Sequence, residues 1–214
     1  WNCPEILKGE FSAKGFSLKK EGLRYPLMVN EARVHIDDSG SDFVLGSGSW
    51  GNSSFNMSAN FGINGMMPYF KDGLISADVD MEQVFDAFNL TDKTPLTFLK
   101  TLPWDVSLSG EGEGFSMKGR VNLEGASLQL GNLTVGFPGT YDENIVFELG
   151  INPREGRVDI DSAILRLRES QVNMTGSFDL HEKRIVRFGV HSTGLDLKDL
   201  SVVSEEREIF SGGV

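Results

Sequence analysis

Between residues 156 and 200, apolar side chains recur at every second position, and this alternation constrains the fold more than any other feature. Successive side chains of an extended strand point to opposite faces of a sheet. The apolar positions are Val158, Ile160, Leu165, Leu167, Val172, Met174, Phe178, Leu180, Val186, Phe188, Val190, Leu195 and Leu197. The residues between them are mostly charged, polar or small. The stretch therefore predicts several β-strands with one apolar and one polar face.

The same alternation runs through most of the chain. It returns at residues 34–45, 55–63, 75–81, 106–123, 128–137 and 145–151. Only 39% of the residues are hydrophobic, which suits a sheet buried on one face better than a doubly covered parallel sheet. Many of the 25 glycines lie between these runs, where turns are expected. We therefore predict an all-β chain built on an antiparallel sheet.

A helical period replaces the alternation in one place. Apolar residues follow helical spacing at 81–90 and 95–102, and Thr94-Pro95 resembles a helix start. We expect short helices at about 82–102 within one β segment at 1–203, followed by a flexible tail at 204–214. The start at Trp1 suggests a piece of a longer protein, and any membrane anchor is expected outside this chain.

Charge and cysteine content limit the possible partners. The net charge is −11 and the basic residues are scattered, which argues against nucleic acid as a partner. An acidic surface also disfavours flat docking on anionic headgroups, although it does not disfavour binding of lipid tails. The lone cysteine, Cys3, leaves no internal disulfide.

No sequence motif for catalysis, a cofactor or a metal stands out. His35, His181 and His191 lack metal-ligand spacing. Residues 46–49 (GSGS) are interpreted as a loop and residues 110–114 (GEGEG) as a hairpin turn, because neither precedes a helix that could position a nucleophile or phosphate. We therefore expect a non-enzymatic protein with no catalytic residue, metal site or cofactor.

Three stretches of the sequence resemble a known protein family. They are TLPWDVSLSGEGEGFSMKGRVNLEGASLQLGNLTVGF (101–137), GRVDIDSAILRLRESQVNMTGSFDL (156–180) and GLDLKDL (194–200). In this style of strand the chain resembles the AsmA-like superfamily, which includes bacterial envelope proteins of the AsmA, TamB and YhdP type. The resemblance covers roughly residues 30–203 and lies in the alternating residue pattern of the strands.

The resemblance implies a curved, incompletely closed β-groove with an apolar concave face. It also implies a bridge-like lipid-transfer protein of the Gram-negative periplasm. The parent protein would be anchored in the inner membrane and would help to carry phospholipids toward the outer membrane during cell-envelope biogenesis. The groove-facing candidates are Leu165, Leu167, Val172, Met174, Phe178, Leu180, Val186, Phe188 and Val190, with Phe55, Met57, Phe61, Phe147 and Leu149 as second choices.

Two other functions remain open at this point. The same apolar residues can fill a closed β-sandwich, because a period of two does not distinguish a filled core from an open trough. The chain would then be a structural or adhesive module of the envelope that binds no lipid. The third alternative is a glycan-active enzyme that uses a pair of carboxylates. Exposed edge strands could also pair between copies of the chain.

Overall fold

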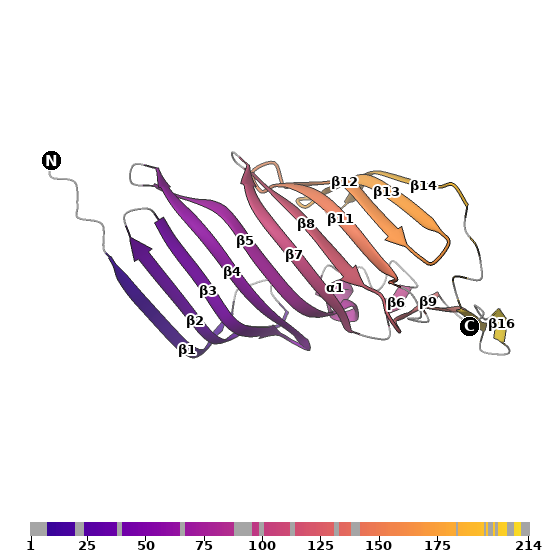
Figure 1. The fold of residues 1–214 in the computed structure, drawn as a ribbon, viewed down its shortest axis with the longest axis horizontal. Helices are drawn as coiled ribbons and strands as arrows, with labels where there is room; N and C mark the ends of the chain where they lie inside the picture. The colour runs from indigo at the N-terminus through magenta and orange to yellow at the C-terminus, as the bar shows by residue number, and fades with distance from the viewer. Residues whose placement is uncertain are drawn as a thin grey trace.

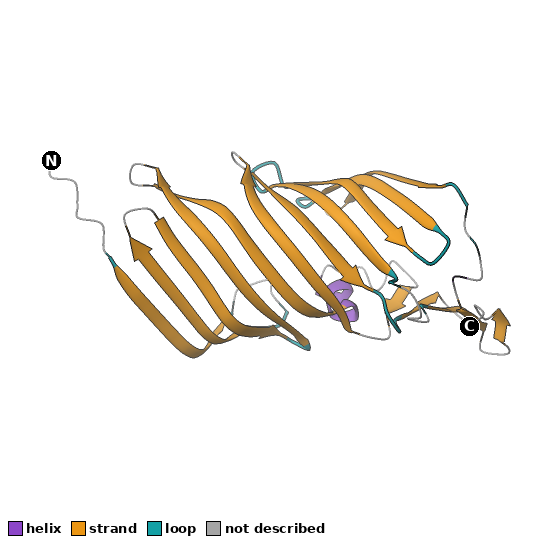
Figure 2. Cartoon of the chain, viewed as in Figure 1, coloured by secondary structure: helices purple, strands orange, loops and turns teal. Residues whose placement is uncertain are grey.

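The computed structural model forms one large open sheet and one small sheet (Figure 1). It describes residues 8–19, 24–37, 40–64, 67–87, 96–98, 101–111, 114–130, 133–137, 142–182, 184–194, 196, 199, 201–204 and 208–210. Nearly all of these residues are in strands (Figure 2). The predicted all-β antiparallel class is confirmed, and the large sheet does not close into a barrel.

The large sheet has eleven strands that follow one another in chain order, apart from the strands that branch off into the small sheet. All neighbouring pairs are antiparallel, and β1 and β14 form the two edges (Figure 1). The strands are β1 (Gly9–Leu18), β2 (Leu27–Asp37), β3 (Gly40–Trp50), β4 (Ser53–Asn64), β5 (Met67–Asp80), β7 (Thr101–Glu111), β8 (Gly114–Asn122), β11 (Asn144–Asn152), β12 (Arg157–Arg166), β13 (Gln171–Asp179) and β14 (Arg184–Ser192).

The small sheet has five strands in the order β16-β15-β10-β9-β6. They are β6 (Leu96–Phe98), β9 (Ser127–Leu130), β10 (Leu133–Gly136), β15 (Ser201–Ser204) and β16 (Glu208–Phe210). Residues 208–210 were expected in a flexible tail, but here they pair with β15, which gives their backbone groups hydrogen-bond partners. Figure 1 shows β6 and β9 beside the lower ends of β7 and β8.

One short helix, α1 (Met81–Ala87), confirms the first part of the helical prediction. The second part is wrong: Leu96–Phe98 is a strand, and β7 begins at Thr101. The leucine spacing suited a helix equally well, but tertiary pairing with β9 and β5 decides the conformation here. Residues 88–95, with the expected cap at Thr94-Pro95, lie outside the described part, as do Leu195 and Leu197.

Helix α1 is fixed to the turn between β3 and β4 through buried Gln83. The Gln83 side chain accepts a hydrogen bond from the Asn52 backbone N–H (2.7 Å) and donates one to the Trp50 carbonyl (2.5 Å). The Gln83 backbone N–H donates to Asp80 Oδ1 (3.1 Å), so Asp80 caps the helix. Gly51 between them has a φ of 58°, and a Cβ there would lie 2.3 Å from Gln83. This turn therefore requires glycine.

The GSGS segment at 46–49 was expected to form a loop. It is part of β3 instead. The register between β3 and β4 is irregular between Leu45 and Gly48, so the strand absorbs extra residues there. A Cβ on Gly48 would lie 2.8 Å from the Phe55 ring. The glycine is therefore explained by the close approach of that ring. The GEGEG segment agrees with a hairpin, because Glu111 of β7 pairs with Gly114 of β8.

Candidate functional site

The register aligns apolar residues in three rows that cross all eleven strands of the large sheet. The first row is Phe11, Val34, Phe43, Ala59, Gly73, Leu108, Met117, Leu149, Ile160, Gly176 and Phe188. The second is Ala13, Ala32, Leu45, Met57, Ile75, Val106, Gly119, Phe147, Ala163, Met174 and Val190. The third is Phe16, Val29, Gly48, Phe55, Ala77, Trp104, Val121, Ile145, Leu165, Val172 and Ser192. We call the surface that contains these rows the apolar face.

The apolar face is continuous because the rows contain only apolar residues and glycine, except for Ser192 at one end. Neighbouring strands lie about 4.8 Å apart, so the ten steps from β1 to β14 span about 48 Å. That distance exceeds the roughly 30 Å thickness of a bilayer's hydrocarbon core. The alternation seen in the sequence is thus brought into register across the whole sheet.

The opposite side, the polar face, shows the complementary pattern. One of its rows contains only polar residues and glycine: Glu10, His35, Asp42, Asn60, Asp72, Ser109, Ser116, Gly150, Asp159, Ser177 and Arg187. Ion pairs also cross between its strands, as in Lys118–Glu148 (2.8 Å). Exposed Leu74 of β5 and Met28 of β2, and half-buried Val146 and Ile164, interrupt the pattern.

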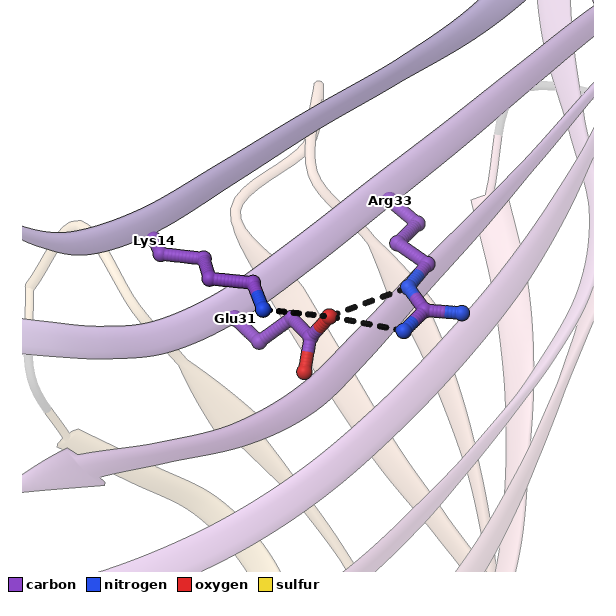
Figure 3. Close-up of polar contacts among 3 residues, drawn as sticks. All are labelled: Lys14, Glu31 and Arg33. Carbon is purple, nitrogen blue, oxygen red and sulfur yellow. Dashed lines mark hydrogen bonds and ion pairs between the residues drawn. The ribbon is translucent and has the colours of Figure 1, made fainter.

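An ion-pair cluster lies on the polar face near the β1 edge (Figure 3). The Glu31 carboxylate accepts two hydrogen bonds from Arg33 (2.8 and 3.0 Å) and lies 3.7 Å from Lys14 Nζ on the neighbouring strand. The Arg33 hydrogen bonds and charge, with Lys14 adding to them, lower the pKa of Glu31. The same contact raises the pKa of Arg33. The contact therefore favours the charged forms of Glu31 and Arg33 on the polar face.

The middle strands of the apolar face carry a buried cluster, which residues outside the large sheet complete. Leu102 and Val106 of β7, Val121 of β8 and Phe147 of β11 are buried there. Leu128 of β9 packs against this cluster from the small sheet. The other buried members of the cluster are Leu123, Ala126, Phe137 and Leu167. This part of the face is the hydrophobic core of the protein.

Toward the β14 edge the apolar face is uncovered. Every residue of β14 is exposed, and Phe188 and Val190 retain 54% and 59% of their accessible surface. At the other edge Phe11 and Leu18 of β1 are also exposed. Large exposed apolar patches of this kind commonly mark sites that bind a partner or lipid.

A hollow of about 470 Å³ lies on the apolar face between the covered middle and the β1 edge. We call it the aromatic hollow. It is lined by Met57, Ala59, Phe61, Tyr69, Phe70, Leu108, Gly114 and Phe115, and no charged residue lines it.

Most of the predicted groove residues lie on the apolar face by register. They are Leu165, Val172, Met174, Phe178, Phe188, Val190, Phe55, Met57, Phe61, Phe147 and Leu149. They differ in environment, since Phe147 is buried in the core while Phe188 and Val190 are exposed. Their predicted contact with lipid stays a prediction.

Three predicted groove residues have no position in the strand register. Leu167 follows the end of β12, where its backbone N–H donates to the Ser170 carbonyl, and it is buried in the core cluster of the apolar face. Leu180 follows the end of β13, and its N–H donates to the Gly156 carbonyl. Val186 is the extra residue of a β-bulge, and Ile185 instead pairs with Phe178. A period of two does not assign the face of these residues, because the turns and the bulge interrupt it.

Sequence reasoning missed several residues of the aromatic hollow. Leu108 and Phe115 share the parity of their strands and could have been nominated from it. Phe70 could not have been nominated from the sequence. A bulge between Phe70 and Asp72 shifts the alternation of side chains within β5.

Within the described ranges, no three His, Cys, Asp or Glu side chains come together as a potential metal site. None of the helical residues in this part of the chain forms a segment of the length and apolarity needed to cross a membrane. Comparison with protein-family models, curated proteins and solved structures gives no significant match. The functional argument therefore depends on the geometry and chemistry of the two faces.

Proposed function

We propose that the apolar face shields the acyl chains of phospholipids and that the chain is a non-catalytic part of a lipid-transfer protein. The observation that supports this most is the continuity of the three apolar rows across eleven strands of an open sheet. Burial of each CH₂ group is worth about 0.8 kcal/mol and has no preferred direction along the surface. An acyl chain can therefore be held by such a surface and still slide along it.

The two faces suit a water-filled compartment crossed by lipid. Acyl chains would lie against the apolar face, while headgroups would stay in water at the open side of the sheet. We place this activity in the periplasm of a Gram-negative bacterium, with the parent protein anchored in the inner membrane and supplying phospholipid for the outer membrane. This placement and the AsmA-like assignment depend on the resemblance of the strands. We propose no nucleic-acid partner and no cofactor.

Lipid co-purification tests the proposal. The chain is incubated with phospholipid vesicles and re-isolated, and bound lipid is measured by native mass spectrometry. Val190→Asp places a charge on the uncovered apolar face and should reduce bound lipid several-fold, because a charge disrupts a dry apolar surface. Leu74→Asp places the same charge on the polar face and should leave binding unchanged. Absence of bound lipid in the unmodified chain would refute the proposal.

A structural or adhesive module is the second candidate, and the covered middle of the apolar face favours it. There residues outside the large sheet pack on it, and Leu123 and Leu102 are almost fully buried. On this view the exposed apolar residues near β14 contact another protein. Stable self-association, or capture of a protein without lipid, would support this candidate.

A further inference from the structure

The aromatic hollow has a shape that suits one flexible hydrocarbon chain. Phe61, Phe70 and Phe115 form a connected wall, with ring centroids 5.7 Å apart for Phe61–Phe70 and 6.5 Å apart for Phe70–Phe115. Both contacts are edge-to-face, the arrangement that aromatic pairs favour. The wall is therefore fixed by its own packing and needs no ligand to form.

Small residues form the low part of this region. Ala59 lies opposite Gly73, and Gly73 lies opposite Leu108 in the same row. A Cβ on Gly73 would lie 2.8 Å from the Ser58 carbonyl oxygen, so no larger residue fits without movement of the backbone. The Phe70 ring lies over Gly73, 3.4 Å from the place of that Cβ, so the aromatic wall packs down on the small residues. The hollow beside the wall is lined without any charge.

A basic residue, Lys71, directly follows the wall residue Phe70 in the chain. Lys71 is the extra residue of the β-bulge between Phe70 and Asp72, and it is exposed. The Lys71 side chain has no hydrogen bond or ion pair with the described residues. Its neighbour Asp72 accepts a hydrogen bond from Asn60 (2.6 Å) on the polar face. The Lys71 ammonium group is thus available for an anion, and its flexible stem starts beside the wall residue Phe70.

An apolar hollow beside an unpaired cation matches an amphiphile with an anionic head. We propose that the aromatic hollow holds one acyl chain of a phospholipid while Lys71 binds its phosphate. This inference rests on the proposed lipid-binding function and adds a defined site and headgroup preference to it. The net charge of −11 opposes anionic lipids overall, so a preference for them must come from a local cation.

The experiment uses vesicles with equal amounts of phosphatidylglycerol and phosphatidylcholine that have the same acyl chains. Bound lipids are extracted from the re-isolated chain and quantified. We expect the unmodified chain to enrich phosphatidylglycerol. Lys71→Gln should lower the ratio of the two lipids by up to about fivefold, the range of an exposed ion pair. Lys19→Gln, an exposed lysine in the connection after β1, should leave the ratio unchanged.

A photo-crosslinking arm locates the acyl chain. A benzophenone amino acid replaces Phe61, which keeps an aromatic group in the wall, or Leu74 on the polar face of β5. Crosslinks to lipid at position 61 and not at position 74 support the site. Lipid that binds without crosslinking at position 61, or with a ratio insensitive to Lys71→Gln, overturns this inference and leaves the proposed function standing. Absence of any bound lipid overturns both.

Discussion

The covered middle of the apolar face and its uncovered β14 end have the same sequence pattern and opposite environments. Phe147 of β11 keeps 7% of its accessible surface, and Phe188 of β14 keeps 54%. Both lie on the apolar face, in adjacent rows. The difference comes from residues outside the large sheet, such as Ala126 and Phe137, which join Phe147 in one buried cluster. The same residue type therefore serves as core in one region and as available surface in the other.

The largest difference in stability between the two regions should come from removing the Phe147 and Phe188 rings. Phe147→Ala removes a buried ring that lies 5.7 Å from the Trp104 ring, and should lower the free energy of unfolding by about 3–5 kcal/mol. Phe188→Ala should lower it by less than about 1 kcal/mol, because half of that ring is already in water. Urea denaturation measures both. Equal losses would mean that something also covers β14 in solution.

A smaller effect should follow from loosening helix α1, whose first residue, Met81, packs against the covered core. Asp80→Ala removes the cap on the Gln83 N–H and should lower the free energy of unfolding by about 1 kcal/mol. Asp78→Ala in the same strand is the control, since its side chain makes no hydrogen bond to the described residues. A loss as large in the control would contradict the capping role.

The smallest expected effect is the pH dependence of stability at the uncovered β14 end of the large sheet. Asp179 is the last residue of β13, and backbone N–H groups of Glu182 and His181 donate to its Oδ1 (2.9 Å each). The Glu182 hydrogen bond is the main cause of its lowered pKa. Because the folded-state pKa lies below the unfolded value, this stabilisation is present above the unfolded pKa of about 3.9. It is lost as the pH falls through the folded pKa.

Hydrogen exchange measured between pH 5 and 2 checks this prediction, after correction for intrinsic exchange rates. Amides of the β13–β14 hairpin should lose protection earlier than those of β7 and β8. In Asp179→Asn, which keeps an acceptor oxygen but cannot ionise, the additional loss at acidic pH should disappear. An unchanged pH profile in that variant would assign the loss to other groups.

The sequence alone determined the class of the fold and the two faces of its sheet. Alternation is a local property, because each extended residue rotates its side chain to the other side, so residues such as Val172 and Met174 could be assigned to one face without a structure. The same reasoning failed where the backbone leaves the regular strand. Leu167 lies in a turn and Val186 in a bulge, so a period of two does not assign their faces. Residues 96–98 were wrongly expected to be helical because their spacing suits helix and strand alike.

Only the tertiary structure decided which part of the apolar face is core and which is open. That outcome depends on which residues outside the large sheet, such as Ala126 and Phe137, fold back onto it. It also decided that Phe70 joins Phe61 and Phe115, and that Lys71 lies beside them. Such contacts depend on strand register and on bulges, which distant partners fix together and which a period of two along the chain does not encode.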